Sequence, residues 1–446
     1  MSSSTQTLVL HDDRGSARAT LRAKLADPLV LRGVASLVDQ AMVSGCNFLT
    51  TLLIGRMCLP EELGLYTLGF SLIVALMKVP KALIWQPYTT FLPAMSADQR
   101  RTFTGSALVQ QIVLGGLLGL VVFTIGASLT PDAHMHGLDA MLRVLGPAMA
   151  LIFLRECVRQ LCFAELRMGQ VVAVDGVMVA LQTAGIAGLA VAGELTATRA
   201  YLVIIAASLP VILGWIWFNR RAIDVQSQRI VPDFTGNYQF ARWLLASAVA
   251  QGVWWLIDPW ALSLMHGTSA AGVYSAAQSI ILLANPLVIS FGNFFGPHAA
   301  HVYAAMGAAQ LYQLVLRTSM VVTVCAGAFT GFLAIWGGDV LVFLFGDSYS
   351  GQGDLVTALM VGEICEMISL PTTMGLLALG RGNVVLAANV FRLLISGTVG
   401  LGMIYQFGPM GVGYSRLASS VGAAIWQWLA LRNVLNELLE NPEILA

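Results

Sequence analysis

The chain has 446 residues, of which 57% are hydrophobic and 11% charged, and its formal net charge at pH 7 is zero. Soluble domains carry about 25% charged residues, so this composition and a mean hydropathy of +0.76 exclude an ordinary soluble protein. A chain without net charge also has no general attraction for nucleic acid, and we expect none as a partner.

Residues 1–32 are polar and basic, and we predict that they form a cytoplasmic leader. Residues 1–16 have the composition of a disordered segment. In residues 17–31, Arg18, Arg22 and Lys24 alternate with leucines, which is typical either of an amphipathic helix on a membrane surface or of a solvated leader. The first apolar run begins near Val30 and is too long for the core of a signal peptide.

Apolar runs of about 20 residues recur along the rest of the chain, each long enough to cross a hydrocarbon core about 30 Å thick. Lipid offers no hydrogen-bond partner to an open backbone, so these runs must be helices, and the alternation required for a barrel is absent. The sequence therefore predicts an all-α polytopic membrane protein with twelve transmembrane helices, near residues 33–55, 66–91, 104–129, 141–162, 171–192, 200–218, 241–264, 270–296, 312–336, 355–379, 384–406 and 411–432.

A long polar connection divides the predicted helices six and six. We predict an N-lobe (33–218, helices 1–6), a cytoplasmic linker (219–240), a C-lobe (241–435, helices 7–12) and a cytoplasmic tail (436–446). An internal repeat supports this division, because Gly64-Leu65-Tyr66 and Gly272-Val273-Tyr274 each open a helix after a short polar break. Lobes of six helices run in the same direction, so an axis along the membrane normal relates them, with a central cavity between them.

The orientation follows from the basic residues. With a cytoplasmic N-terminus, 17 of the 24 Lys and Arg residues lie in inside segments, whereas only Arg56 and Arg199 lie outside. This asymmetry predicts a multi-pass protein of the inner (plasma) membrane with both termini in the cytoplasm.

Two lysines lie midway along the second predicted helix. Lys78 and Lys81 are three residues apart and share one helix face, and Pro80 between them weakens the backbone hydrogen bonding. We expect their ammonium groups to face the cavity, where they would suit an anionic substrate such as a pyrophosphate. The alternative is that either lysine extends to the membrane surface.

Four carboxylates lie inside predicted helices. Asp39 and Asp258 occupy related positions in the first helix of each lobe, and Glu363 and Glu366 share one helix face. A carboxylate in a cavity of low dielectric constant can take up a proton or bind Na⁺, so all four are ion-coupling candidates. The alternative is that each neutralises a nearby basic residue. Arg392 either binds substrate or pairs with Glu363 or Glu366.

Three arginines lie at the inner end of the fourth predicted helix and in the turn after it, namely Arg155, Arg159 and Arg167. They either set the topology or attract anionic head groups.

His134 and His136 are too few to indicate a metal site. The chain contains no P-loop, Gly-x-Ser-x-Gly, His-Glu-x-x-His or Cys-x-x-Cys motif. We therefore expect no catalytic residues, no cofactor and no metal, and we expect that the protein is not an enzyme.

Four stretches together resemble a known family. They are Asn47-Phe48 to Gly64-Leu65-Tyr66, the run RECVRQLCFAELR at 155–167, Asp258 with Gly272-Val273-Tyr274, and Phe345-Gly346-Asp347-Ser348-Tyr349. They are similar to Wzx-type polysaccharide flippases of the multidrug/oligosaccharidyl-lipid/polysaccharide exporter superfamily, over about residues 30–435.

The resemblance implies two six-helix lobes around a central cavity that opens alternately to each side. It implies transport of a polyprenyl-diphosphate-linked sugar from the inner to the outer leaflet for surface polysaccharide biosynthesis, with H⁺ or Na⁺ as the coupling ion. The implied partners are membrane lipid and polysaccharide-assembly proteins. The cavity residues that would bind the diphosphate are Lys78, Lys81, Arg56 and Arg392.

Three alternatives remain open. A multidrug and toxin extruder would share the fold, although two cavity lysines would repel a cationic drug. A membrane glycosyltransferase, ligase or polymerase would be expected to have a long outside loop with clustered Arg, His or carboxylates, and the sequence predicts no such loop. A carrier of the major facilitator type would share the six-plus-six division but not the Gly-x-Tyr hairpins.

Overall fold

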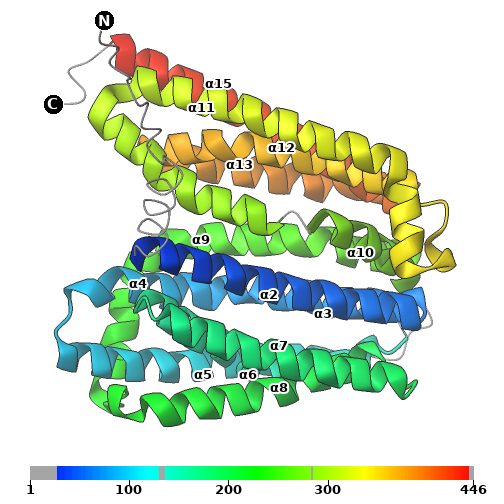
Figure 1. The fold of residues 1–446 in the computed structure, drawn as a ribbon, viewed down its shortest axis with the longest axis horizontal. Helices are drawn as coiled ribbons and strands as arrows, with labels where there is room; N and C mark the ends of the chain where they lie inside the picture. Colours follow the sequence, from blue (N-terminus) through cyan, green and yellow to red (C-terminus); the bar gives the residue numbers. More distant parts are fainter. Residues whose placement is uncertain (1–27, 130–135, 283–284, 441–446) are drawn as a thin grey trace, which may run out of the picture.

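The computed structural model describes residues 28–129, 136–282 and 285–440, and every regular element in these ranges is a helix (Figure 1). Most of the predicted leader, His134 and the last six residues lie outside them. The N-terminal half contains α2 (Pro28–Met57), α3 (Pro60–Pro80), η1 (Lys81–Trp85), α4 (Gln86–Phe91), η2 (Leu92–Ala94), α5 (Ala97–Ser128), α6 (Leu138–Ala164), α7 (Met168–Val191), α8 (Ala197–Asn219) and η3 (Arg220–Ala222). The C-terminal half contains α9 (Ser227–His266), α10 (Thr268–Leu282), α11 (Asn285–Phe345), η4 (Asp347–Tyr349), α12 (Gly353–Ala378), α13 (Gly382–Ile395), η5 (Ser396–Gly400), α14 (Leu401–Phe407) and α15 (Pro409–Glu440).

Nine helical segments of the described chain are long and apolar enough to cross a membrane, as expected for a multi-pass membrane protein. The other three predicted spans fall on α6, on α10 with the beginning of α11, and on α15. Charged side chains within α6, among them Arg155, Glu156 and Arg159, lower its apolar character. The same charges form the site described below.

Local chemistry determines where several helices begin, bend or break. Ser96 begins α5 with a capping box, in which its hydroxyl accepts from the Gln99 backbone N–H. Pro80 has no N–H to donate, and the five residues after it form a π-helix, η1, a conformation frequent at functional sites. Gly307 has a φ of 81° and breaks α11 into two helices. Within the predicted linker 219–240, α9 already begins at Ser227.

The two halves lie one above the other in Figure 1, with α2–α8 below, α11, α12, α13 and α15 above, and α9 and α10 between them. One hydrophobic cluster joins them at the end of the molecule where α2 meets α3. It contains Leu63 and Tyr66 from the N-terminal half and Tyr274, Leu341 and Leu355 from the C-terminal half. This end is the predicted outer end.

At the opposite, predicted inner end, the buried apolar side chains divide into two separate clusters. One contains Tyr88, Phe103 and Val158 and, apart from Ala241 of α9, belongs to the N-terminal half. The other contains Leu311 and Leu376 of the C-terminal half. Among the described residues, the shared core therefore holds the halves together at the outer end.

The glycines of the internal repeat form a close contact between the halves. A Cβ atom on Gly64 would lie 1.9 Å from the Thr268 carbonyl oxygen, and one on Gly272 would lie 2.0 Å from the Pro60 carbonyl oxygen. The two contacts are reciprocal, since Thr268 and Pro60 each precede a repeat glycine by four residues. No side chain fits at either position, so the backbones of α3 and α10 meet directly.

Candidate functional site

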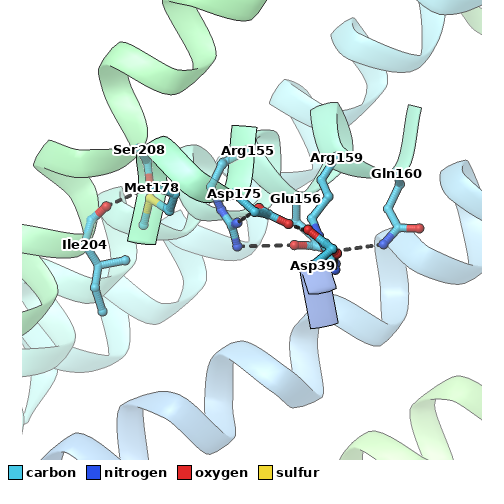
Figure 2. A network of polar contacts seen from close by, with 9 residues as sticks. All are labelled: Asp39, Arg155, Glu156, Arg159, Gln160, Asp175, Met178, Ile204 and Ser208. Atoms are coloured by element: carbon cyan, nitrogen blue, oxygen red, sulfur yellow. Dashed lines mark hydrogen bonds and ion pairs between the residues drawn. The ribbon is translucent and has the colours of Figure 1, made fainter. Parts of the chain in front are cut away.

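The N-terminal half buries a cluster of ion pairs around Arg159 of α6 (Figure 2). One Arg159 Nη donates to Asp39 Oδ2 of α2 at 2.6 Å, and the other donates to Glu156 Oε1 at 2.9 Å. Its Nε donates to Asp175 Oδ2 of α7. Arg155 lies one turn earlier on α6 and donates to Asp175 Oδ1 at 3.1 Å. A single guanidinium therefore links three helices.

The cluster holds one more negative charge than positive charges. Asp39, Glu156 and Asp175 face two guanidinium groups, and Asp39 and Asp175 have no exposed surface. The second carboxylate oxygen of Asp39, Oδ1, is buried without a hydrogen-bond partner. A buried unbalanced charge is costly, and one proton or one monovalent cation would neutralise it. Asp39 therefore has a basic partner, as in the alternative to ion coupling, and one of its oxygens is left unpaired.

A cavity of about 220 Å³ adjoins this cluster within the N-terminal half. Its charged wall is formed by Arg155, Glu156 and Asp175, and its aromatic wall includes Tyr66 and Tyr201. The rings of these two tyrosines are stacked with centroids 5.3 Å apart, and the Tyr201 hydroxyl donates to the Tyr66 carbonyl oxygen. The cavity therefore combines an acidic surface with aromatic faces.

The C-terminal half contains a second cluster, centred on Arg416 of α15. Arg416 Nε donates to Asp258 Oδ2 of α9 at 2.8 Å, and its two Nη atoms donate to the Gln278 side chain and to the Tyr274 hydroxyl, both on α10. As in Asp39, the other carboxylate oxygen of Asp258 is buried without a partner. Each first-helix aspartate therefore pairs with an arginine through one carboxylate oxygen and leaves the other oxygen unpaired.

The second cluster continues through α12 and α13. Arg392 Nη1 lies 3.3 Å from Glu366 Oε1, which also accepts from the Ser420 hydroxyl. Of the two roles predicted for Arg392, substrate binding or pairing with a glutamate, this conformation shows the pairing, with Glu366. Arg392 Nε is buried without a partner. Glu363 has no hydrogen bond or ion pair within the described residues.

A small pocket of about 70 Å³ lies between the halves. Ser71 and Tyr66 of α3 line one side, and Trp255, Tyr274 and Gln278 of α9 and α10 line the other. It holds no more than a few water molecules. In this conformation, the halves would have to separate further to admit a sugar diphosphate here.

Lys78 is half-buried and Lys81 is exposed. The Ser71 hydroxyl accepts from the Trp260 indole of α9, and the Ala75 carbonyl oxygen lies 2.9 Å from a Cβ built on Gly252 of α9. Residues 71, 75 and 78 share one helix face, so Lys78 lies on the face of α3 directed toward α9. In the described part of the chain, neither lysine has a hydrogen-bond or carboxylate partner.

Arg56 lies at the outer end, where its Nη1 donates to the Phe343 and Leu344 carbonyl oxygens at 2.7 and 3.0 Å. It therefore caps the end of α11 and ties α2 to the C-terminal half.

Sequence reasoning did not find the partnership of Arg155 and Arg159 with Asp39 and Asp175, nor the central position of Arg416. A signal was present, because Arg155 and Arg159 are four residues apart and so lie on one face of a predicted membrane helix.

Neither a protein-family model nor a curated protein sequence matches the chain. Solved structures do share the fold. A multidrug resistance MATE family transporter of the MOP superfamily in an inward-facing conformation matches with a TM-score of 0.70 at 16% identity, over 89% of this chain and 95% of that one. An outward-facing conformation of such a transporter gives 0.64 at 14% identity, over 93% and 96%. The lipid II flippase MurJ, inward closed, gives 0.72 at 12% identity, over 90% and 87%.

At these identities the likeness establishes the fold, which is that of MOP superfamily transporters. This is the superfamily named by the sequence resemblance, although the structural likeness does not single out the Wzx type within it. The proteins compared are transporters and a flippase.

Proposed function

We propose that this protein is an alternating-access transporter that flips a lipid-linked oligosaccharide from the cytoplasmic to the outer leaflet for surface polysaccharide biosynthesis. The observation that carries the proposal is Lys78, a half-buried ammonium group without a counter-charge. Such a group inside a membrane helix is costly unless an anion visits it. A diphosphate supplies that anion, and the π-helical bend at Lys81 provides a second ammonium group nearby.

The conformation fits one state of such a cycle. The core that joins the halves lies at the predicted outer end, whereas the inner ends have separate cores. We infer an inward-facing state, in which substrate would reach the lysines from the cytoplasmic leaflet. The higher TM-score with the inward-facing transporter than with the outward-facing one agrees with this inference. Twelve membrane helices in two lobes and cytoplasmic termini belong to the same proposal.

Ion coupling is assigned to the two buried clusters. Each has three carboxylates and two guanidinium groups, and each holds a buried aspartate oxygen without a partner. Uptake of H⁺ or Na⁺ would remove one net negative charge from a low-dielectric region and so favour a different packing of the halves. Asp39, Asp258, Glu363 and Glu366 are the proposed coupling residues, and Arg392 remains a candidate for substrate contact.

The test is the double variant Lys78→Ala/Lys81→Ala, expressed in a strain that lacks the native gene. We expect loss of surface polysaccharide while the protein still inserts in the membrane, because the phosphate would lose both ammonium groups. The matched control is Lys78→Arg/Lys81→Arg, which keeps both charges and should retain much of the polymer. Unchanged polymer in the alanine variant would contradict the proposal.

A second candidate is export of organic cations, and it is favoured by the cavity in the N-terminal half. That cavity has two carboxylates, one guanidinium and stacked aromatic rings, which suit a flat cation. Fluorescent dye accumulation in cells distinguishes the two functions. An extruder would lower the accumulation of a cationic dye and would keep its activity without both lysines. A flippase would leave dye accumulation unchanged and would lose its activity without both lysines.

A further inference from the structure

A large basic pocket lies at the predicted inner end of the N-terminal half, away from Lys78 and from both buried clusters. Its volume is about 610 Å³. Three connections line it: η2 with the beginning of α5, the turn between α6 and α7, and η3. The sequence predicts all three on the cytoplasmic side, so the pocket opens where cytoplasmic-leaflet head groups and soluble anions are available.

The charge in this pocket is strongly unbalanced. Four arginines line it (Arg100, Arg101, Arg167 and Arg221), with one carboxylate, Glu165. Glu165 is already engaged, since its Oε2 lies 2.6 Å from Arg167 Nε and its Oε1 accepts from the Tyr88 hydroxyl at 3.4 Å. The side chains of Arg101 and Arg221 have no partner among the described residues. Four exposed arginines thus line a pocket whose single carboxylate is already paired.

Backbone contacts hold the segments that carry these arginines. The Asp224 N–H donates to the Arg101 carbonyl oxygen at 3.1 Å, and the Asp224 carbonyl oxygen lies 2.1 Å from a Cβ built on Gly105. Because Gly105 has no side chain, the segment after η3 lies directly on α5 and keeps Arg221 close to Arg101. Convergence of the like charges is therefore built into the fold, and an anion would relieve their repulsion.

The other two arginines are oriented by hydrogen bonds. Arg100 Nε donates to the Met95 carbonyl oxygen at 3.0 Å, and Arg167 Nη1 donates to Asn219 Oδ1 at 2.9 Å. Leu166, directly before Arg167 in the chain, has a φ of 57°, a left-handed conformation rare for a residue with a branched side chain. Its side chain is 54% exposed and lines the pocket with Pro93, beside the charged groups.

We propose that this pocket is a binding site for a phosphate-bearing head group, held mainly by Arg101 and Arg221. Guanidinium groups bind phosphate oxygens through paired hydrogen bonds, and the apolar wall suits the glycerol or acyl carbons next to a lipid phosphate. An anionic lipid and free phosphate or pyrophosphate share this chemistry. The site goes beyond the proposed transport cavity, since every residue that lines it lies in the N-terminal half.

The experiment uses the full-length protein with Arg101→Gln/Arg221→Gln. Native mass spectrometry measures bound lipid after extraction from nanodiscs of phosphatidylcholine with or without phosphatidylglycerol, and calorimetry measures binding of inorganic phosphate and pyrophosphate. For the anion that binds the wild-type protein, we expect the affinity of the double variant to be at least about tenfold lower, because two charge-assisted contacts are lost.

The matched control is Arg229→Gln/Arg242→Gln, which removes the same charge from exposed positions that do not line the pocket. It should bind like the wild-type protein. Should the glutamine pair fail to fold, Arg101→Lys/Arg221→Lys keeps both charges but loses the paired hydrogen bonds, and an intermediate affinity is expected. Selective retention of phosphatidylglycerol identifies a lipid ligand, whereas pyrophosphate binding identifies a soluble one.

Three results would overturn the site: no anion binding by the wild-type protein, undiminished binding by the glutamine pair, or an equal loss in the control pair. None of these measurements requires transport, so failure of this site is distinguishable from failure of the flippase proposal.

Discussion

Each half of the molecule holds three carboxylates and two arginines that are buried or half-buried, yet the two clusters differ in how fully these groups are paired. In the N-terminal half, Arg159 contacts all three carboxylates, and Arg155 reinforces two of them. In the C-terminal half, Arg416 pairs with one carboxylate, and Glu363 pairs with none of the described residues. The first cluster therefore locks three helices together, whereas the second has groups free to change partner.

The largest expected effect comes from Arg159→Ala. It leaves three buried carboxylates around a single guanidinium, and removing one partner of a buried ion pair costs about 3–5 kcal/mol. We expect a large drop in the thermal unfolding temperature in detergent, with little folded protein recovered.

Arg143→Ala is the control for that experiment, because Arg143 lies on the same helix and pairs with Asp139 at 3.5 Å with 48% of its side chain exposed. An exposed pair contributes about 0–1 kcal/mol. Equal behaviour of the two variants would show that the cluster around Arg159 does not hold the N-terminal half together.

Arg392→Ala should have a smaller effect on stability. Arg392 makes one ion pair, at 3.3 Å, and lies over the Trp254 ring, but its Nε is unbonded, so removing it breaks few contacts. We expect a loss of about 1–2 kcal/mol in the free energy of unfolding, mostly from leaving Glu366 less neutralised. A loss as large as that of Arg159→Ala would contradict the difference between the clusters.

Asp39→Asn and Asp258→Asn test coupling directly. Each keeps the shape of the side chain and an oxygen that can accept from its arginine, but neither variant can ionise at that position. We expect both proteins to fold and transport in vesicles to lose part of its dependence on pH or Na⁺. Unaltered ion dependence in both would make these aspartates structural.

The smallest expected effect on stability is that of Glu363→Gln, because Glu363 has no ion pair to lose. We expect a change below about 1 kcal/mol in the free energy of unfolding. If Glu363 takes up the coupling ion, the same variant still alters the ion dependence of transport, and Thr357→Val on the same helix should not. A severely destabilised Glu363→Gln would reveal a partner that this conformation does not show.

Much of the fold could be predicted from the sequence, because long apolar runs in lipid must form helices to satisfy their backbone hydrogen bonds. The repeat at Gly64 and Gly272 was also readable, but the direct contact between these glycines was not, since a motif does not say what it packs against. The pairing of Asp39 with Arg159 joins residues 120 positions apart. That pairing depends on how α2 and α6 pack, which local pattern does not determine.

In the proposed transport cycle, the halves close alternately at the two ends around an anionic substrate. Pulsed electron–electron double resonance measures distances between pairs of spin labels and so follows this movement. One pair lies at the outer end (Leu59→Cys and Leu264→Cys) and one at the inner end (Leu166→Cys and Met306→Cys), in a protein that lacks the six native cysteines. With a polyprenyl-diphosphate sugar and the coupling ion, we expect the outer distance to lengthen as the inner distance shortens. Distances that stay fixed at both ends under every condition would contradict it.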